Sequence, residues 1–359
     1  MSYTIALGGV ACTTKTSILK KFSKHYGIKV HLSDYKELHD TYEFDHRVGS
    51  LLYAAYNVMS NAKYLTDYNT MHMFDRHPME ALVYESINKE MSVEDTRRAL
   101  QDCVKMGFFK YYKCVVMRAK PHTEKQIVRM MKKRNNRIDR LDEDYVRQQD
   151  ERFAVFAEVV SADEYEIDCT GDLNEQQREI ETNLLNTIYR WTLIDDSLHV
   201  YEHRLPIIRN KIAAFDLDGT IIETKSGRVY SENAYDWKFK YTSVVQNFID
   251  LLRSGYTIVV VTNQLGVTEG KVSAEEMRAK IEYVCTALSV PLVVMMATRK
   301  DRYRKPRTGT MEYLLTRQPN IKKRESFFCG DNVNGTLAHD SDYARACNMK
   351  FLYDFEYFV

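Results

Sequence analysis

Two carboxylates stand two residues apart at the end of a short apolar run. The segment Ile212–Phe215 continues directly into Asp216-Leu217-Asp218-Gly219-Thr220. Such a run predicts a buried strand, and open α/β sheets bind ligands at the carboxyl ends of their parallel strands. An acid pair there suits phosphoryl transfer, because one carboxylate can attack phosphorus while the other handles the proton of the leaving oxygen. Mg²⁺ would hold a phosphate dianion against these acids.

Three further polar groups follow in the order that this chemistry needs. Thr262 and Asp331 each come directly after a predicted strand, and Lys305 lies in a basic segment between them. They offer a hydroxyl for the phosphate, a third acid for the metal and a cation for the phosphorylated carboxylate. An isolated Asp-x-Asp-Gly could instead be a turn or a calcium loop, and the ordered set of groups argues against that alternative.

These segments resemble the haloacid-dehalogenase superfamily and, more narrowly, the 3′-phosphatase domain of polynucleotide kinase/phosphatase. The matching segments, in chain order, are FDLDGTII, Ser226-Gly227-Arg228, Asp236-Trp237, TNQLGVTEGK (Thr262–Lys271), YRKPRTG (Tyr303–Gly309) and FFCGDNVNG (Phe327–Gly335). The resemblance implies an Mg²⁺-dependent enzyme that acts on 3′-phosphates at DNA ends.

The resemblance also assigns roles to single residues. It implies that Asp216 is the nucleophile, that Asp218 is the general acid and base, and that both bind Mg²⁺ together with Asp331. Thr262 is then a phosphate ligand and Lys305 the neutralising cation. Asp342 falls at the last acidic position of the family's C-terminal segment, but the residues around it differ from the family pattern and its role stays open.

A basic run surrounds Lys305 and could bind the DNA. It contains a single acid, Asp301, and its cations are Arg299, Lys300, Arg302, Arg304 and Arg307. We expect Arg302, Arg304 and Arg307 to hold phosphates next to the scissile one without reading bases. The alternative is a solvated surface segment.

A second phosphate-binding pattern stands near the N-terminus. The run Tyr3–Leu7 enters Gly9-Val10-Ala11-Cys12-Thr13-Thr14-Lys15-Thr16, which fits the loop G-x-x-x-x-G-K-[ST] except that Thr14 replaces the second glycine. Such a loop aims backbone N–H groups at a nucleotide phosphate, with Lys15 between phosphates and Thr16 on Mg²⁺. If position 14 needs a positive φ, a β-branched residue there is strained, so the loop is either an active ATP site or a relic.

Two other segments support a kinase. The predicted strand Met71–Phe74 ends in Asp75-Arg76-His77-Pro78, and residues 132–142 form a basic turn that could close over ATP. FDRHPMEAL and RNNRIDRLD resemble segments of herpesvirus-type thymidine kinases and thymidylate kinases. The resemblance implies that Asp75 and Arg76 line the acceptor site, that Asp34 activates an acceptor hydroxyl, and that the arginines of a mobile lid are Arg134, Arg137 and Arg140.

The acceptor of the kinase stays open at this point. We favour thymidine or thymidylate, with ATP as donor, in a bifunctional enzyme that serves DNA synthesis or repair. The main rival is a polynucleotide 5′-hydroxyl kinase, which would make the chain a complete enzyme for healing DNA ends. A third hypothesis is a non-catalytic nucleotide-binding or DNA-binding module, which the threonine at position 14 would allow.

The elements that must position these groups alternate between strands and helices. The predicted strands are Tyr3–Leu7, Lys29–Leu32, Met71–Phe74, Lys113–Met117 and Tyr165–Cys169, and then Ile212–Phe215, Thr257–Val261, Leu292–Ala297, Ser326–Cys329 and Phe351–Tyr353. This alternation predicts two three-layer α/β/α domains with mostly parallel sheets. We expect a kinase-like domain over residues 1–193, a linker over residues 194–209 that contains Pro206, and a phosphatase domain over residues 210–359.

Composition narrows the class of protein. A length of 359 residues suits two domains, and the net charge of +1 excludes a generally basic coat, so nucleic-acid contacts must come from patches. Seven cysteines without a Cys-x-x-Cys pair predict reduced thiols in a cytoplasmic or nuclear protein. We expect no membrane span, since no stretch approaches ~18 apolar residues, and no signal peptide, since the N-terminus lacks a basic region.

Overall fold

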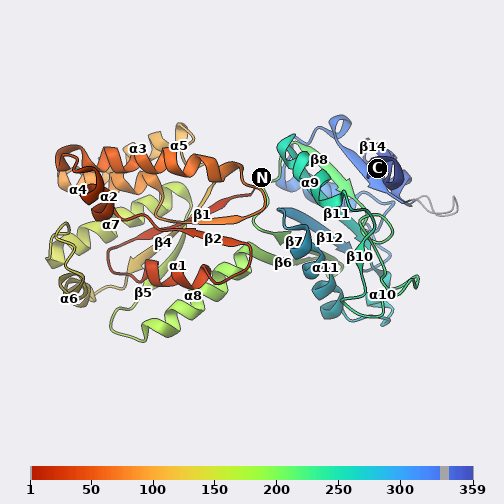
Figure 1. The fold of residues 1–359 in the computed structure, drawn as a ribbon, viewed down its shortest axis with the longest axis horizontal. Helices are drawn as coiled ribbons and strands as arrows, with labels where there is room; N and C mark the ends of the chain where they lie inside the picture. The colour runs from red at the N-terminus through yellow and green to blue at the C-terminus, as the bar shows by residue number, and fades with distance from the viewer. Residues whose placement is uncertain (1, 332–338, 359) are drawn as a thin grey trace. The chain divides into compact units, whose positions relative to one another are not determined.

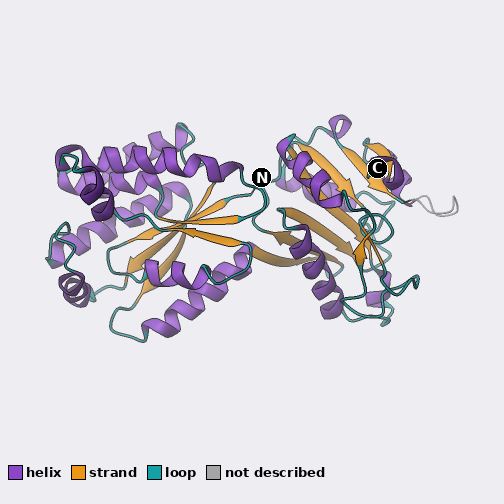
Figure 2. Cartoon of the chain, viewed as in Figure 1, coloured by secondary structure: helices purple, strands orange, loops and turns teal. Residues whose placement is uncertain are grey.

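The computed structural model describes residues 2–331 and 339–358, and its internal contacts divide the chain after Leu184 (Figure 1). The first unit is Tyr3–Leu184, and the second contains Ser2 and the chain from Leu185 onward. The predicted class, α/β with mostly parallel sheets, is confirmed in both units (Figure 2). Within the described residues no helix is both long enough and apolar enough to cross a membrane.

A five-stranded parallel sheet forms the centre of the first unit. Its strand order is β2-β3-β1-β4-β5, and every neighbouring pair runs parallel. All six residues of the central strand are buried, as expected for a strand covered on both faces. The strands are β1 (Thr4–Gly9), β2 (Ile28–His31), β3 (Met71–Asp75), β4 (Tyr112–Ala119) and β5 (Asp163–Ile167).

Helices cover both faces of this sheet. Helices α1 and α8 lie on one side of it and α3, α5 and α7 on the other (Figure 1). The helices are α1 (Lys15–Phe22), α2 (Tyr35–Tyr42), α3 (Gly49–Ala62), α4 (Ala81–Asn88), α5 (Val93–Lys105), α6 (Glu124–Arg134), α7 (Glu143–Val160) and α8 (Leu173–Ile188). The crossovers bring the ends of β1, β2 and β3 to one edge of the sheet, which is where the phosphate-binding pattern lies.

A seven-stranded mixed sheet forms the centre of the second unit. Its order is β14-β13-β8-β11-β12-β7-β6, in which the pairs β12·β7 and β7·β6 are antiparallel and the others parallel. The strands are β6 (Tyr189–Ile194), β7 (Leu198–His203), β8 (Lys211–Phe215), β11 (Tyr256–Asn263), β12 (Leu292–Ala297), β13 (Phe327–Gly330) and β14 (Lys350–Tyr353). A separate small hairpin pairs β9 (Ile222–Glu223) with β10 (Lys238–Phe239).

Alternate residues of these strands pack against helices on the two faces. On one face the ring of Phe215 packs against that of Phe248 in a tilted arrangement, and Val260 lies with Ile281. On the other face Val259 packs in a core that includes residues of α12 and α13. The helices of this unit are α9 (Val244–Arg253), α10 (Leu265–Thr268), α11 (Ala274–Leu288), α12 (Gly309–Arg317), α13 (His339–Ala346) and α14 (Asp354–Tyr357).

The predicted linker over residues 194–209 is wrong at residues 198–203. Residues 198–203 form β7, which pairs along its whole length with β12 and is buried throughout. The strand is difficult to predict from the sequence because its residues, LHVYEH, mix apolar side chains with His and Glu. Glu202 is nevertheless buried, since its carboxylate accepts hydrogen bonds from Arg190 (Nε, 2.9 Å) and Arg317 (2.8 Å). The boundary between the units falls inside α8.

Candidate active sites

Three carboxylates meet at the carboxyl edge of the second sheet. Asp216 follows β8, Asp331 follows β13 and Asp340 lies in the first turn of α13. One oxygen from each lies within 4.8 Å of the others, which is a spacing that a single metal ion can bridge. The sequence predicted the first two residues but missed Asp340. Asp342, whose role stayed open, is a surface residue paired with Arg345 at 3.0 Å.

A buried lysine connects two of these acids. Lys305 Nζ lies 2.5 Å from Oδ1 of Asp216 and 2.7 Å from Oδ1 of Asp340, and the lysine is only 2% exposed. Burial alone would lower the pKa of Lys305, but the two carboxylates outweigh burial and raise it. Burial raises the pKa of Asp216 to about 8, and Asp340 acts in the same direction while Lys305 opposes it. A bound divalent cation would favour the ionised form of Asp216.

The loop that carries Lys305 is fixed by a side chain of β11. Asn263 accepts a hydrogen bond from the backbone N–H of Lys305 at 3.0 Å and donates one to its carbonyl at 3.1 Å. The neighbouring residue, Thr262, is buried at the end of the same strand, as the predicted phosphate ligand should be. Asn263 therefore holds the Lys305 loop next to Thr262, the predicted phosphate ligand.

Asp218 is held by two side chains that do not belong to the group of three acids. Its Oδ1 accepts a hydrogen bond from Lys280 (2.8 Å) and its Oδ2 one from Gln264 (2.6 Å). The group of three acids does not include its carboxylate, so the structure does not support the prediction of Asp218 as a side-chain metal ligand. The position suits the other predicted role, proton transfer, because the carboxylate is held and still half-exposed.

Two glycines allow the acids to approach the backbone. A Cβ on Gly219, whose φ is +83°, would lie 2.3 Å from Oδ2 of Asp331. A Cβ on Gly330 would lie 2.3 Å from Oδ2 of Asp340. Any side chain at either position would displace a carboxylate, so these glycines are part of the site. The rest of the FFCGDNVNG segment, residues 332–335, lies outside the described residues.

The predicted DNA-binding arginines have different surroundings. Arg302 is exposed and forms an ion pair with Glu312 at 3.0 Å, and the exposed Arg307 donates a hydrogen bond to a backbone carbonyl. Arg304 is partly buried, and its Nη1 has no hydrogen-bond partner among the described residues. Burial lowers the pKa of Arg304. All three flank Lys305 in sequence and offer positive charge beside it.

The phosphate loop of the first unit runs from the end of β1 to the start of α1. Gly9 has a φ of +118°, and a Cβ there would lie 2.2 Å from the carbonyl oxygen of Met117. Thr14 adopts the left-handed conformation, with φ 62° and ψ 7°, directly before α1. The expected strain at this threonine is therefore present. Its Oγ1 is buried without a hydrogen-bond partner among the described residues.

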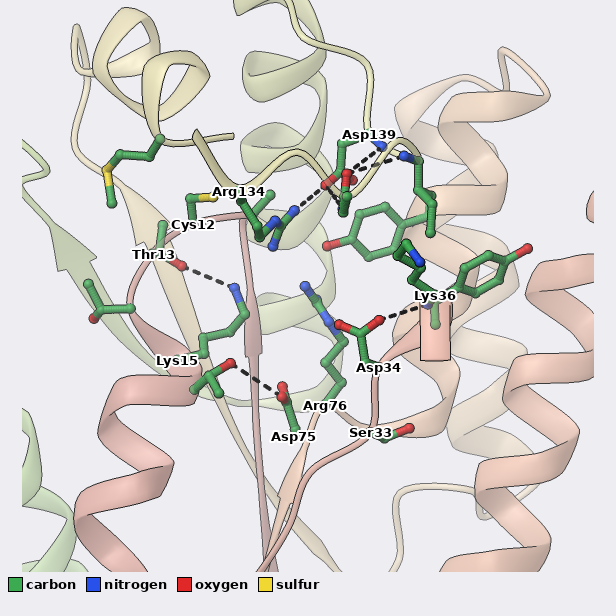
Figure 3. A pocket seen from close by; sticks show the side chains of 18 of the residues that line it. Cys12, Thr13, Lys15, Ser33, Asp34, Lys36, Asp75, Arg76, Arg134 and Asp139 are labelled. Atoms are coloured by element: carbon green, nitrogen blue, oxygen red, sulfur yellow. Dashed lines mark hydrogen bonds and ion pairs between the residues drawn. The ribbon is translucent and has the colours of Figure 1, made fainter. Parts of the chain in front are cut away.

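The loop borders a cavity of about 880 Å³. Figure 3 shows Lys15, Arg76 and Asp34 pointing into the same space, with Arg134 approaching from the C-terminal end of α6. Lys15 Nζ donates hydrogen bonds to the carbonyl of Val10 and to Oγ1 of Thr13 (3.3 Å). Burial, with a contribution from the charge of Arg76, lowers the pKa of Lys15 to about 7. A phosphate in this space would favour its charged form.

Residues at the end of β3 contact the phosphate loop. Thr16 Oγ1 lies 3.5 Å from a carboxylate oxygen of Asp75, so the two predicted residues are neighbours. Arg76, with φ +75°, donates hydrogen bonds to the carbonyl of Gly9 (3.1 Å) and to Glu80 (3.2 Å). Burial raises the pKa of Asp75. The loop, Asp75 and Arg76 therefore form one connected site.

Two buried residues of this site were not predicted. Glu80 is 1% exposed and accepts hydrogen bonds from the backbone N–H groups of Gly9 (3.3 Å) and His77 (3.0 Å). Gln149 of α7 accepts one from the N–H of Ala11 at 3.0 Å. Polar residues inside apolar helical segments could have drawn attention to both. They hold the loop that the nucleotide would contact.

Of the other predicted kinase residues, some line the cavity and one does not. Asp34 lines the cavity but also caps α2, where its carboxylate accepts from the N–H groups of Lys36 and Glu37. Arg134 and Arg137 line the cavity, and Arg134 forms an ion pair with Asp139. Arg140 is not among the lining residues; it pairs with Asp142 (3.4 Å) and lies over the ring of Tyr145. The structure therefore does not bring Arg140 to the predicted ATP site.

A known protein family matches the part of the chain that contains the second site. Residues 211–358 match the family described as polynucleotide kinase 3 phosphatase. The bifunctional polynucleotide phosphatase/kinase of Schizosaccharomyces pombe is 36% identical over 186 residues, which are 50% of this chain and 45% of that protein. The second unit is thus a phosphatase domain of this family, and the chain is an enzyme.

A viral relative defines the family of the chain more closely. An uncharacterized 33.9 kDa protein of the Lymantria dispar multicapsid nuclear polyhedrosis virus is 41% identical over 217 residues, which are 60% of this chain and 75% of that protein. The chain belongs to the same family as this viral protein. A deoxyadenosine kinase structure from M. mycoides is 17% identical, covers 52% of this chain and 100% of that chain, and gives a TM-score of 0.37.

Proposed function

We propose that the second unit removes 3′-phosphates from DNA ends by an Mg²⁺-dependent aspartyl-phosphate mechanism. The carrying observation is the geometry around Lys305, whose ammonium lies between Asp216 and Asp340 at the carboxyl edge of the sheet. This cation stabilises negative charge that develops where a phosphate meets Asp216. The basic run from residue 299 to 307 supports a polyanionic substrate.

The residues present fit a magnesium ion. The group of three acids offers only carboxylate oxygens, which are the ligands that this hard cation prefers. Asp216, Asp331 and Asp340 would hold the ion, which when bound shields the phosphate dianion from the acids. We expect Asp340→Asn to raise the Mg²⁺ concentration needed for half-maximal activity by about tenfold. Asp342→Asn is the matched control and should leave it unchanged, because Asp342 pairs with Arg345 on the surface and is not one of the three acids.

The chain's own residues then carry two chemical steps. A carboxylate oxygen of Asp216 attacks phosphorus, and the bond from phosphorus to the 3′-oxygen breaks as Asp218 gives that oxygen a proton. Thr262 donates a hydrogen bond to a phosphate oxygen. In the second step Asp218 takes a proton from water, the water oxygen attacks phosphorus, and the bond to Asp216 breaks. Inorganic phosphate leaves and both carboxyl groups return to their starting states.

The direct test is phosphate release from an oligonucleotide that carries a 3′-phosphate. We expect release with Mg²⁺, none after chelation with EDTA, and recovery when Mg²⁺ is added in excess. The same oligonucleotide with a 5′-phosphate is the control for position. Equal release from both ends would contradict the assignment of a 3′-phosphate substrate.

We further propose that the first unit transfers the γ-phosphate of ATP to thymidine or thymidylate. The supporting observation is that Lys15, Arg76, Asp34 and Arg134 line one cavity, large enough at about 880 Å³ for two small substrates. The rival acceptor is a 5′-hydroxyl DNA end, and the name of the S. pombe relative favours it. Seven free cysteines agree with action in a reducing cytoplasm or nucleus.

Labelled ATP decides among the acceptors. The full chain is offered thymidine, thymidylate and 5′-hydroxyl DNA in parallel, and we expect label on a small nucleotide in the absence of DNA. Label only on DNA would replace this proposal with the end-healing rival. Nucleotide binding without any transfer would show that the first unit is a non-catalytic module.

A further inference from the structure

A lysine is buried behind the proposed general acid. Lys280 lies on α11 and is 4% exposed, although its side chain carries a charge. Burying an ammonium group is unfavourable unless the charge is paired and hydrogen-bonded. Its Nζ lies 2.8 Å from Oδ1 of Asp218 and 2.7 Å from Oγ of Ser231. Among the described residues, the carboxylate that this lysine pairs with is therefore the proton-transfer group of the proposed reaction.

The second oxygen of the same carboxylate has a separate donor. Gln264 Nε2 lies 2.6 Å from Oδ2 of Asp218 and 2.9 Å from Oγ1 of Thr262. The two oxygens are thus held by side chains from different elements, which fixes both the position and the plane of the carboxylate. The side chain of Asp218 remains 46% exposed. The exposed part is free to face a substrate while the rest is held.

The loop between β9 and β10 supplies the other partner of the lysine. Within this loop Asp236 accepts hydrogen bonds from the N–H (2.8 Å) and Oγ (2.7 Å) of Ser226 and from the N–H of Glu232 (3.0 Å). These bonds fix the loop next to Ser231. The hydroxyl oxygen of Ser231 is therefore held in place to accept a hydrogen bond from the ammonium group of Lys280.

We infer that Lys280 is a positioning residue for Asp218 in the phosphatase reaction. The ammonium group of Lys280 holds the carboxyl group of Asp218 so that the carboxyl faces the leaving 3′-oxygen. The carboxyl of Asp218 gives that oxygen a proton as the bond to phosphorus breaks, and it then accepts a proton from water. Lys280 itself contacts neither the three metal-binding acids nor Lys305 in any interaction of the described residues. The inference rests on the proposed phosphatase function.

Removing the ammonium group should slow the chemical step without weakening substrate binding. For Lys280→Met we expect kcat on 3′-phosphorylated DNA to fall by about 30-fold, within the range of a lost proton-transfer group, with KM changed less than about twofold. Lys280→Arg keeps the charge and should recover part of the rate. Lys322→Met is the matched control, because Lys322 is half-exposed and pairs with Glu325 on the surface.

The leaving group separates positioning from a general structural role. Release of the leaving group is measured in a single turnover, with enzyme in excess, for 3′-phosphorylated DNA and for p-nitrophenyl phosphate. Nitrophenolate leaves without needing a proton, whereas the 3′-oxygen of a sugar does need one. We expect the loss in Lys280→Met to be at least about tenfold larger for DNA. Equal losses for the two substrates would overturn the inference.

A double variant tests whether the lysine acts through Asp218. Asp218→Asn/Lys280→Met should be no slower than Asp218→Asn, because the group that Lys280 positions is already absent. A further tenfold loss would contradict the inference. Thermal unfolding checks that each variant folds, and Ser231→Ala replaces Lys280→Met if the latter does not. That variant keeps the ion pair but loosens the lysine, so we expect a smaller loss that is again selective for DNA.

The wild-type chain separates this inference from the proposed function. If it releases no phosphate from 3′-phosphorylated DNA, the proposed function fails and the inference fails with it. If the wild type is active and folded Lys280→Met is equally active, the inference alone is wrong.

Discussion

The two sites differ in how far their charged groups are assembled in the ligand-free chain. In the second unit Lys305 already contacts Asp216 and Asp340, and Asp218 is held on both oxygens. In the first unit the charged groups surround an open cavity, and Lys15 contacts the carbonyl of its own loop. A hydrolase that carries its own nucleophile needs one substrate besides water, so its site can be built in advance. A transferase must admit a donor and an acceptor and then close.

The largest effect should come from the nucleophile of the assembled site. We expect Asp216→Asn to lower phosphate release by at least about a thousandfold, because the amide has nearly the same shape but is a poor nucleophile. Phosphate release and thermal unfolding are measured together. Asp250→Asn, on an exposed ion pair with Arg253, should be unaffected. Residual activity within tenfold of wild type would show that Asp216 is not the nucleophile.

The second prediction concerns the boundary between the two units. A fragment that starts at Leu185 should be soluble and release phosphate, whereas one that starts at Asn210 should not. The shorter fragment lacks β6 and β7, and it exposes the edge of β12, a strand whose six residues are all buried. Expression, size-exclusion chromatography and phosphate release measure the difference. Equal solubility and activity of the two fragments would show that β7 is dispensable.

The third prediction separates the two activities. Lys15→Ala should lower transfer from ATP to any acceptor by about a hundredfold or more, because in the proposed reaction the loop lysine contacts the transferred phosphate. Phosphate release from DNA should stay within about twofold, since the acids proposed to catalyse it lie in the other unit. Lys20→Ala, at an exposed position of α1, is the control. A loss of both activities would mean that the sites are not independent.

The smallest effect should come from the strained threonine. Thr14→Gly removes a β-branched side chain from a left-handed position, which should raise the free energy of unfolding by about 1 kcal/mol. If the strain also limits the loop, ATP affinity rises a few-fold; thermal unfolding and calorimetric ATP titration measure the two effects. Thr13→Gly is the contrasting variant, because Thr13 is buried and its hydroxyl donates to Val10. A destabilised Thr14→Gly would show that the threonine side chain supports the loop.

Groups that directly follow a strand were predictable from the sequence. An apolar run places the next residue at the edge of a parallel sheet, so Asp216 and Thr262 could be identified from their neighbours. Lys15 lies further along, at the start of α1, and was identified from the spacing of the phosphate-loop pattern. The same holds for the positive φ at Thr14, because the phosphate loop requires it whatever residue is present.

Groups that reach a site through tertiary packing could not be predicted. Asp340 and Lys280 lie on helices, where the neighbouring sequence does not indicate which sheet edge a side chain faces. Arg140 shows the converse, since a basic run does not reveal which of its members faces the cavity. The strand β7 was missed because its buried Glu202 resembles a surface residue until Arg190 and Arg317 are placed beside it.

The antiparallel strand β7 also has a consequence for the order of folding during synthesis. The hairpin β6–β7 leaves the ribosome directly after the first unit, but its partner β12 begins at Leu292, about 90 residues after Leu198. Until then the β7 edge of the hairpin is unpaired. For β7 to pair with β12, the long chain segment between them must first form a closed loop, which costs conformational entropy. The central strands β8 and β11 are made in this interval. The second unit therefore completes its sheet late. Until β12 has been synthesised, the unpaired backbone edge of β7 can pair with strands of other chains.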